Sequence, residues 1–212
     1  PSANGGSLVT AALGERRLCY TVAEPGEHWI ANSLAVMGAI FAAGGDLGAA
    51  GLALAEMGGL KGRGARHRIA VPGGHALLID ESYNANPASM RATLVQLGHT
   101  PASRRIAVLG SMKELGDFAP AFHAQLIEPL VEAQVDFAVL VGTEMGALAR
   151  ELGKGAHNPL GKPLAFAHCG GPGEAIAALE EFGLAGGDAV LVKGSNSVGL
   201  ARVVAHFAAR EG

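Results

Sequence analysis

The pattern of hydrophobic and polar positions changes near residue 66, and it predicts two regions of mixed helix and strand. The first region opens with two short β-prone runs, Leu8–Ala12 and Arg16–Val22. A helix is predicted from about His28 to Ala43, followed by a second helix that Asp46 can cap. The apolar residues of the first helix recur at helical spacing, at Ile30, Leu34, Met37 and Phe41.

Beyond residue 66, apolar runs alternate with helical segments. Five runs predict strands: Ala76–Asp80, Ile106–Leu109, Phe137–Val141, Leu164–Ala167 and Ala189–Val192. Helices are predicted at Pro87–Leu97, Ala119–Ala133, Met145–Leu152, Glu174–Phe182 and Ser197–Ala209, the second of them kinked by Pro129. Strands that are apolar at nearly every position are typical of burial on both sides. We therefore expect a Rossmann-like, mostly parallel sheet with helices on both faces.

The boundary between the two regions is rich in glycine and basic residues. Residues 58–75 form a candidate hinge, and we place the domain boundary near Arg66, which divides the chain into residues 1–66 and 67–212. The strand predicted at Arg68–Val71 is the one β-like piece in this stretch. The first residues lack an initiator methionine and are typical of a loop, so we expect the chain to be part of a longer protein.

Composition narrows the possible functions. Hydrophobic residues make up 49% of the 212 and charged residues 17%, enough apolar side chains to bury a core. The net charge of −3 and the lack of a basic patch argue against nucleic acid. No apolar run is long enough to span a membrane. Cys19 and Cys169 have no metal-ligand spacing, so we expect no metal site or disulfide framework, and a reducing cytoplasm.

Polar residues gather where the predicted strands end. In parallel sheets, ligands bind beyond the carboxyl ends of the strands. Asp80 and Glu81 are suited to ribose hydroxyls, and the carboxamides of Asn84 and Asn86 are suited to phosphates or bases, with Tyr83 between them. Asn86 followed by Pro87 is also typical of a helix cap, which needs no ligand.

Three other sites are candidates for ligand contacts. Lys193 and Ser195, with the glycine between them, could bind an anion at the start of a helix, although a plain strand-to-helix turn explains them as well. His28 and Asn32 lie four residues apart on one helix face, opposite the apolar stripe, and on spacing alone a solvated face explains them better than a ligand site. Arg63, between two glycines, could contact a phosphate or ribose, or lie in a mobile linker.

The order of these segments resembles the Mur ligase family. The segments 26–35, 61–63, 79–90, 108–116 and 191–195 are similar to family motifs, and the resemblance runs from about Leu8 to the end of the chain. Its most specific piece is Tyr83-Asn84-Ala85-Asn86-Pro87. That segment is similar to the members that add a dipeptide, and related ligases, including those that add glutamate to folate, carry other residues there.

The resemblance implies an ATP-dependent peptide ligase that uses Mg²⁺. Such a ligase adds D-alanyl-D-alanine to UDP-N-acetylmuramoyl-tripeptide in peptidoglycan synthesis, through an acyl phosphate. Carried over by motif, the nucleotide-binding residues are His28, Asn32, Arg63, Asp80, Glu81, Tyr83, Asn84 and Asn86, with Asn32 facing adenine. Lys193 and Ser195 are expected to lie toward the incoming dipeptide.

The chain departs from the family pattern in several places. Trp29, Ser111 and Asn196 stand where the family often has Asn, Asp and Arg, respectively. No G-x-x-G-K-[ST] loop occurs. We therefore expect the phosphate-binding loop, the UDP-binding domain and most Mg²⁺ ligands to lie upstream, residues 1–66 to be the tail of the ATP-binding domain, and this chain to be inactive by itself. The alternatives are a folylpolyglutamate synthase-like ligase, a nucleotide-binding module without chemistry, and, third, a dehydrogenase, which the missing glycine fingerprint disfavours.

Overall fold

The computed structural model describes residues 6–23, 26–57, 61–157 and 161–209. The chain divides into two compact units, one up to residue 59 and one from residue 60. The first unit has one hydrophobic core, and the second has two, one on each face of its sheet. The two units are therefore described separately.

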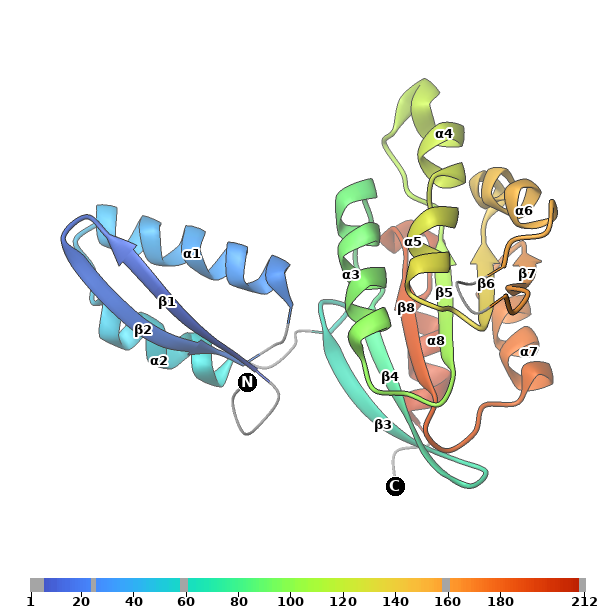
Figure 1. Cartoon of the computed structure of the whole chain (residues 1–212), viewed down its shortest axis with the longest axis horizontal. Coiled ribbons are helices and arrows are strands. Elements are labelled where there is room, and N and C mark those ends of the chain that lie inside the picture. The colour runs from blue at the N-terminus through green and yellow to red at the C-terminus, as the bar shows by residue number, and fades with distance from the viewer. Residues whose placement is uncertain (1–5, 24–25, 58–60, 158–160, 210–212) are drawn as a thin grey trace. The chain divides into compact units, whose positions relative to one another are not determined.

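The first unit is a β-hairpin covered by two helices (Figure 1, blue ribbons). Strand β1 (Ser7–Leu13) pairs antiparallel with β2 (Arg16–Val22), and the turn contains Gly14 at φ 59°. Helix α1 (Glu27–Ala42) is followed by α2 (Leu47–Glu56). The Asp46 carboxylate accepts hydrogen bonds from the amides of Gly48 and Ala49, so the predicted cap is confirmed.

Only part of the apolar stripe predicted for α1 packs in the core, through Ile30 and Met37. Met37 is buried, whereas Leu34 and Phe41 are both 39% exposed. The packed face instead includes Ser33, whose hydroxyl donates to the Ile30 carbonyl at 2.8 Å and lies 3.0 Å from the hydroxyl of buried Tyr20. Because α1 carries apolar residues on several sides, helical spacing alone could not select the buried one.

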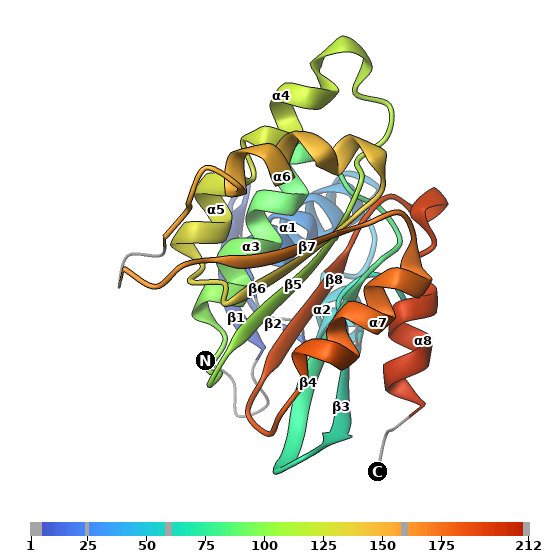
Figure 2. The same cartoon turned by 90° about the vertical axis from the view of Figure 1, so that its right-hand side faces the viewer.

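The second unit contains a six-stranded sheet in the order β3-β4-β8-β5-β6-β7 (Figure 2). Neighbouring strands from β4 to β7 pair in parallel, and only the edge strand β3 is antiparallel. This confirms the mostly parallel sheet. The strands are β3 (Ala65–Val71), β4 (Gly74–Glu81), β5 (Arg105–Gly110), β6 (Phe137–Val141), β7 (Ala165–Cys169) and β8 (Ala189–Lys193).

Helices cover both faces of this sheet. Along β5, Ala107 and Leu109 pack in one core with α3 to α6, while Ile106 and Val108 pack in the other with α7 and α8. The helices are α3 (Pro87–His99), α4 (Ala119–Ala124), α5 (Ile127–Glu132), α6 (Gly146–Leu152), α7 (Pro172–Phe182) and α8 (Ala201–Ala208). The short 3₁₀ turns η1 (Gly116–Phe118), η2 (Thr143–Met145) and η3 (Asn196–Val198) precede α4, α6 and α8.

The helix predicted at Ala119–Ala133 is two helices, and the prediction of one kinked helix was wrong. The break falls at Gln125 and Leu126, between α4 and α5. Pro129 has no N–H to donate to the Gln125 carbonyl, so the helix cannot continue through that bond. Pro129 instead lies in the first turn of α5, where a missing N–H costs little.

The candidate hinge at 58–75 is largely part of the sheet. Its residues 65–75 form the β3–β4 hairpin, with Ala65 opposite Asp80 and Val71 opposite Gly74. The Gly64 amide extends this ladder with a 2.8 Å bond to the Asp80 carbonyl. The unit therefore begins a few residues before the predicted boundary at Arg66, and residues 58–60 of the candidate hinge lie outside the described residues.

The strand order puts a topological switch at β8. The chain leaves β4 through α3 and enters β5, which leaves a position between them for β8, the last strand. Helix α3 packs on one face of the sheet, and α8, which follows β8, packs on the other. The carboxyl ends of β4, β8 and β5 therefore lie side by side at the point where the helices part, which is where parallel sheets bind ligands.

Candidate functional site

Asp80, at the end of β4, is buried and fully engaged. Its carboxylate accepts hydrogen bonds from the Gly62 amide at 2.8 Å, the Ser82 amide at 3.0 Å and the Ser82 hydroxyl at 2.6 Å. The side chain is only 1% exposed. Asp80 therefore ties the turn that carries Arg63 to the end of the sheet, a role that its position in the sequence did not predict.

Arg63 and Tyr83, which were predicted separately, meet at this turn. The guanidinium carbon lies 4.4 Å from the centre of the Tyr83 ring, within the range of a cation–π contact. The Tyr83 amide also donates to the Gly62 carbonyl at 3.0 Å. Gly62 has φ 75°, and a Cβ there would come within 2.8 Å of the Tyr83 Cβ. A glycine before Arg63 is thus required for this approach.

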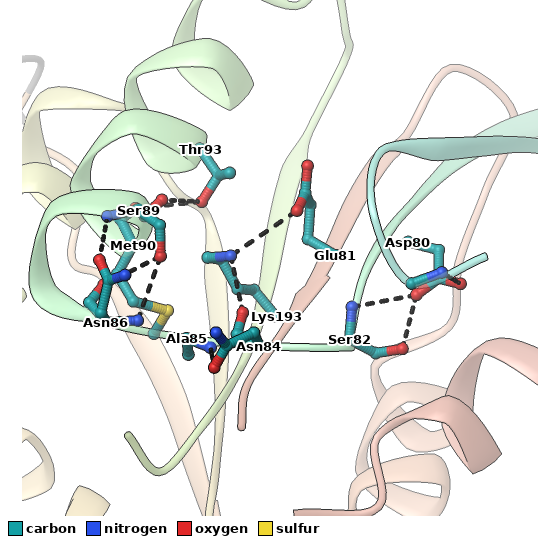
Figure 3. Close-up of polar contacts among 11 residues, drawn as sticks. Asp80, Glu81, Ser82, Asn84, Ala85, Asn86, Ser89, Met90, Thr93 and Lys193 are labelled. Carbon is teal, nitrogen blue, oxygen red and sulfur yellow. Dashed lines mark hydrogen bonds and ion pairs between the residues drawn. The ribbon is translucent and has the colours of Figure 1, made fainter. Parts of the chain in front are cut away.

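Lys193 joins the end of β8 to the loop after β4 (Figure 3). Its ammonium donates to the Asn84 carbonyl at 3.0 Å and lies 3.7 Å from a carboxylate oxygen of Glu81. Burial lowers the pKa of Lys193, and the nearby Glu81 carboxylate offsets part of that shift. Three residues predicted for two different ligands, Glu81, Asn84 and Lys193, therefore form one cluster.

The two carboxamides of the loop make local hydrogen bonds. Asn84 Oδ1 accepts from the Ala85 amide at 2.8 Å. Asn86 Oδ1 accepts from the Ser89 amide at 2.8 Å, and the Ser89 hydroxyl oxygen accepts from the Asn86 amide at 3.1 Å. With Pro87 at the first helical position, this is a capping box, so the helix-cap interpretation of Asn86 is confirmed. Both side chains are exposed, and their contact with a nucleotide stays a prediction.

Ser195 lies where the turns after β8 and β5 meet. Its amide donates a hydrogen bond to the Ser111 carbonyl at 3.2 Å, and its hydroxyl oxygen accepts a hydrogen bond from the Lys113 amide at 3.0 Å. A Cβ on Gly194 would lie 2.9 Å from the Cα of Gly110, so only glycine allows the two turns to approach this closely. Ser195 therefore lies at the predicted edge of the sheet, where it bonds to the neighbouring turn.

An ion pair between Lys113 and Glu144 bridges the ends of β5 and β6. The pKa of Glu144 is lowered to about 2. The hydrogen bond from the Lys113 ammonium has the largest effect, and hydrogen bonds from the backbone and from Ser111 add to it. Beneath this turn, the Met112 amide donates to Nε2 of buried His123 at 2.9 Å. That contact assigns the His123 proton to Nδ1, which donates to the Ala119 carbonyl at 2.6 Å. The sequence placed Lys113 and Glu144 at strand ends but offered no signal that they pair.

His28 and Asn32 belong to the other unit. They lie one helical turn apart on α1, with Asn32 exposed and His28 half-buried, and the His28 ring lies 5.8 Å from that of Trp29. This spacing agrees with a shared helix face. Their predicted approach to the base of a nucleotide stays a prediction.

The described residues at this edge of the sheet offer positive groups to an anionic ligand. Mg²⁺ requires several oxygen ligands, and no group of three or more metal-ligating side chains occurs among these residues. The Asp80 carboxylate accepts three hydrogen bonds from the protein, and one oxygen of Glu81 lies 3.7 Å from the Lys193 ammonium. The guanidinium of Arg63 is suited to a phosphate.

In the described part of the chain, no helix is long and apolar enough to cross a membrane.

Comparisons with known proteins identify the family to which this chain is similar. Residues 66–196 match the family described as "Mur ligase, glutamate ligase domain". The chain is 36% identical over 149 residues, 70% of its length, to the UDP-N-acetylmuramoyl-tripeptide–D-alanyl-D-alanine ligase of Synechocystis, and 35% identical over 193 residues, 84% of its length, to that of Mycobacterium bovis. It covers 30% and 37% of those proteins, so it spans about a third of their length.

Solved structures support the same assignment. A MurF structure from Acinetobacter baumannii matches 97% of this chain with a TM-score of 0.78 at 25% identity, and the chain covers 43% of it. A Thermotoga maritima MurF structure in complex with ADP also matches 97% of the chain, with a TM-score of 0.73 at 21% identity, which supports the fold, and the chain covers 44% of it. Taken with the matched family model, these likenesses show that the chain belongs to the Mur ligase family.

Proposed function

We propose that this chain is part of an ATP-dependent ligase that adds D-alanyl-D-alanine to UDP-N-acetylmuramoyl-tripeptide. The observation that carries the proposal is the cluster at the switch point of the sheet. There the Arg63–Tyr83 pair and the Glu81–Lys193–Asn84 group meet at the end of β4. The names of the curated relatives supply the substrates.

The proposed reaction has two steps. ATP transfers its terminal phosphoryl group to the carboxylate at the end of the tripeptide, releasing ADP and forming an acyl phosphate. The amine of D-alanyl-D-alanine then attacks the acyl carbon, and phosphate leaves as the amide bond forms. Positive groups such as Arg63 would offset the charge that develops on the phosphoryl oxygens, and bound Mg²⁺ would supply further stabilisation of that charge. The Mg²⁺ ligands are assigned to the part of the protein that this chain does not include.

The site residues divide into two groups in this proposal. The residues on the nucleotide side are His28, Asn32, Arg63, Asp80, Glu81, Tyr83, Asn84 and Asn86. Arg63 contacts phosphate or ribose, and Asp80 acts by holding the Arg63 turn. Ser195, where the β5 and β8 turns meet, lies on the side of the incoming dipeptide. The contacts of Lys193 support a different role, which is developed below.

Residues 1–66 include the tail of the ATP-binding domain in this proposal. Two features of the first unit support this. Among its described residues the sheet has two strands, fewer than is usual for a domain. Large apolar side chains are also exposed, with Leu8 at 63% and Leu52 at 69%. Both features fit a piece of a larger domain, and the chain by itself is then a catalytically inactive part of a cytoplasmic enzyme.

Phosphate release by the full-length protein tests the function. The assay contains ATP, Mg²⁺, UDP-N-acetylmuramoyl-tripeptide and D-alanyl-D-alanine, and each is omitted in turn. Release that requires both peptide substrates supports the ligase. Release that ignores the dipeptide contradicts this specificity, and nucleotide binding without any release favours a non-catalytic module. Production of ADP by the isolated chain would refute its proposed inactivity.

A further inference from the structure

Lys193 is a buried cation whose partners lie far away in the sequence. Its side chain is 4% exposed, and that of Glu81 is 14% exposed. Lys193 is the last residue of β8, Glu81 is the last residue of β4, and Asn84 lies in the loop that follows β4. Because β8 and β4 are neighbours in register, with Lys193 opposite Glu81, the side chain extends directly beneath this segment.

The contacts of the ammonium are directed at the loop. It donates to the Asn84 carbonyl at 3.0 Å, and Figure 3 shows it between that carbonyl and the Glu81 carboxylate. A buried charge is costly unless it is paired and hydrogen-bonded. Here both conditions are met, by Glu81 at the end of β4 and by Asn84 in the loop after it. Removing the ammonium would leave the Asn84 carbonyl without this donor and the Glu81 carboxylate without this cation.

Direct contact of Lys193 with a dipeptide is difficult to reconcile with this geometry. A substrate carboxylate would have to reach an ammonium that is almost inaccessible, and it would compete with Glu81 for the same charge. It would also have to displace the Asn84 carbonyl. The glycine and serine that follow Lys193 are turned toward the β5 turn instead, through the bond between the Ser195 amide and the Ser111 carbonyl.

We propose that Lys193 is a positioning residue for the nucleotide side of the site. Its ammonium holds the Glu81–Asn84 segment against the end of β8, and this sets the position of Tyr83 and of Arg63, which stacks on it. Loss of the ammonium therefore weakens ATP binding and leaves the binding of the incoming dipeptide unchanged. The kinetic part of this inference rests on the proposed ligase function.

The kinetic test uses the full-length ligase with Lys193→Met, which keeps the length of the side chain and removes its charge. We expect KM for ATP to rise about tenfold, because the Arg63–Tyr83 pair would no longer be held in its binding position. KM for D-alanyl-D-alanine should change less than about twofold. Lys193→Arg, which keeps the charge, should recover part of the ATP affinity. Lys154→Met, at an exposed lysine paired with Glu151, is the matched control and should change neither value.

The opposite split of the kinetic constants would overturn the proposal. A rise in KM for the dipeptide with an unchanged KM for ATP would show that Lys193 contacts the dipeptide. Equal effects on both constants would show a general structural role. If the wild-type ligase itself shows no release dependent on dipeptide, the proposed function fails, and the positioning role is decided by the second measurement below.

Amide hydrogen exchange can be measured on the present chain without any enzymatic activity. In Lys193→Met, the amides of Tyr83 and Ala85 should exchange several-fold faster than in the wild type, because the loop that holds them loosens. Amides in β6 and β7, at the other side of the sheet, should be unchanged. Unchanged exchange at Tyr83 and Ala85 would refute the positioning role. If Lys193→Met does not fold, Glu81→Gln provides the same comparison from the other partner.

Discussion

Replacing Asp80 with asparagine tests whether this carboxylate holds the Arg63 turn to the sheet. The carboxylate accepts from three donors, the Gly62 amide, the Ser82 amide and the Ser82 hydroxyl. The asparagine side chain keeps the shape but offers one oxygen and an NH₂ group. If the oxygen faces Ser82, the NH₂ group faces the Gly62 amide, and two donors oppose each other.

The cost follows from these contacts. A buried amide without an acceptor costs about 1–3 kcal/mol, and the bonds to Ser82 lose the strengthening that the charge provides, about 1 kcal/mol. Asp80→Asn should therefore destabilise the second unit by about 2–4 kcal/mol. For a unit of this size, each kcal/mol lowers the melting temperature by about 2–4 °C, so we expect a drop of about 5–15 °C.

Thermal unfolding followed by far-ultraviolet circular dichroism is the assay for Asp80→Asn. The single tryptophan, Trp29, lies in the first unit, so its fluorescence does not follow this change directly. Ser82→Ala is the matched control. It removes only the 2.6 Å hydroxyl bond and should cost about 1 kcal/mol. A drop below about 2 °C for Asp80→Asn, or an equal drop for both variants, would refute the reasoning.

Three further predictions concern neighbouring parts of the site. Gly62→Ala places a Cβ 2.8 Å from that of Tyr83, at a residue with φ 75°. The free energy of unfolding in urea should therefore fall by about 2 kcal/mol or more. A variant as stable as the wild type would show that glycine is not required at this position. Glu144→Gln should be less stable than the wild type at neutral pH. Because the pKa of Glu144 is lowered from 4.5 to about 2 in the folded chain, its stabilisation is complete above the unfolded value and is lost as the pH falls through this interval. The difference in unfolding free energy between the two proteins should therefore shrink below about pH 4.5, and a difference independent of pH would argue against the Lys113 pair. His123→Leu leaves the buried Met112 amide without this acceptor and removes the side-chain bond to the Ala119 carbonyl, and it should cost about 1–3 kcal/mol in the same urea titration. His206→Leu, at a partly exposed histidine, should cost less than about 1 kcal/mol.

Local features of the fold could be predicted from the sequence because each depends on neighbouring residues. The strands β4, β5, β6 and β8 were found because both of their faces are buried, so their sequences are apolar at nearly every position. The caps at Asp46 and Asn86 were found because a capping side chain bonds to amides two or three residues away. The family motifs followed from the order of short segments along the chain.

Features that depend on distant residues were decided by the tertiary structure. The position of β8 between β4 and β5 could not be predicted from the sequence. This position brings Lys193 to the Asn84 carbonyl and Ser195 to the Ser111 turn. The ion pair of Lys113 with Glu144 requires β5 and β6 to be neighbours in the same way.

The buried face of α1 also depended on the tertiary structure. Apolar residues occur on several sides of this helix, and only packing against β1, β2 and α2 selects Met37 over Leu34 and Phe41. Spacing along a chain reports which residues share a face of one element. Which elements become neighbours is set by how the cores pack, and the residues of this site are brought together at that level.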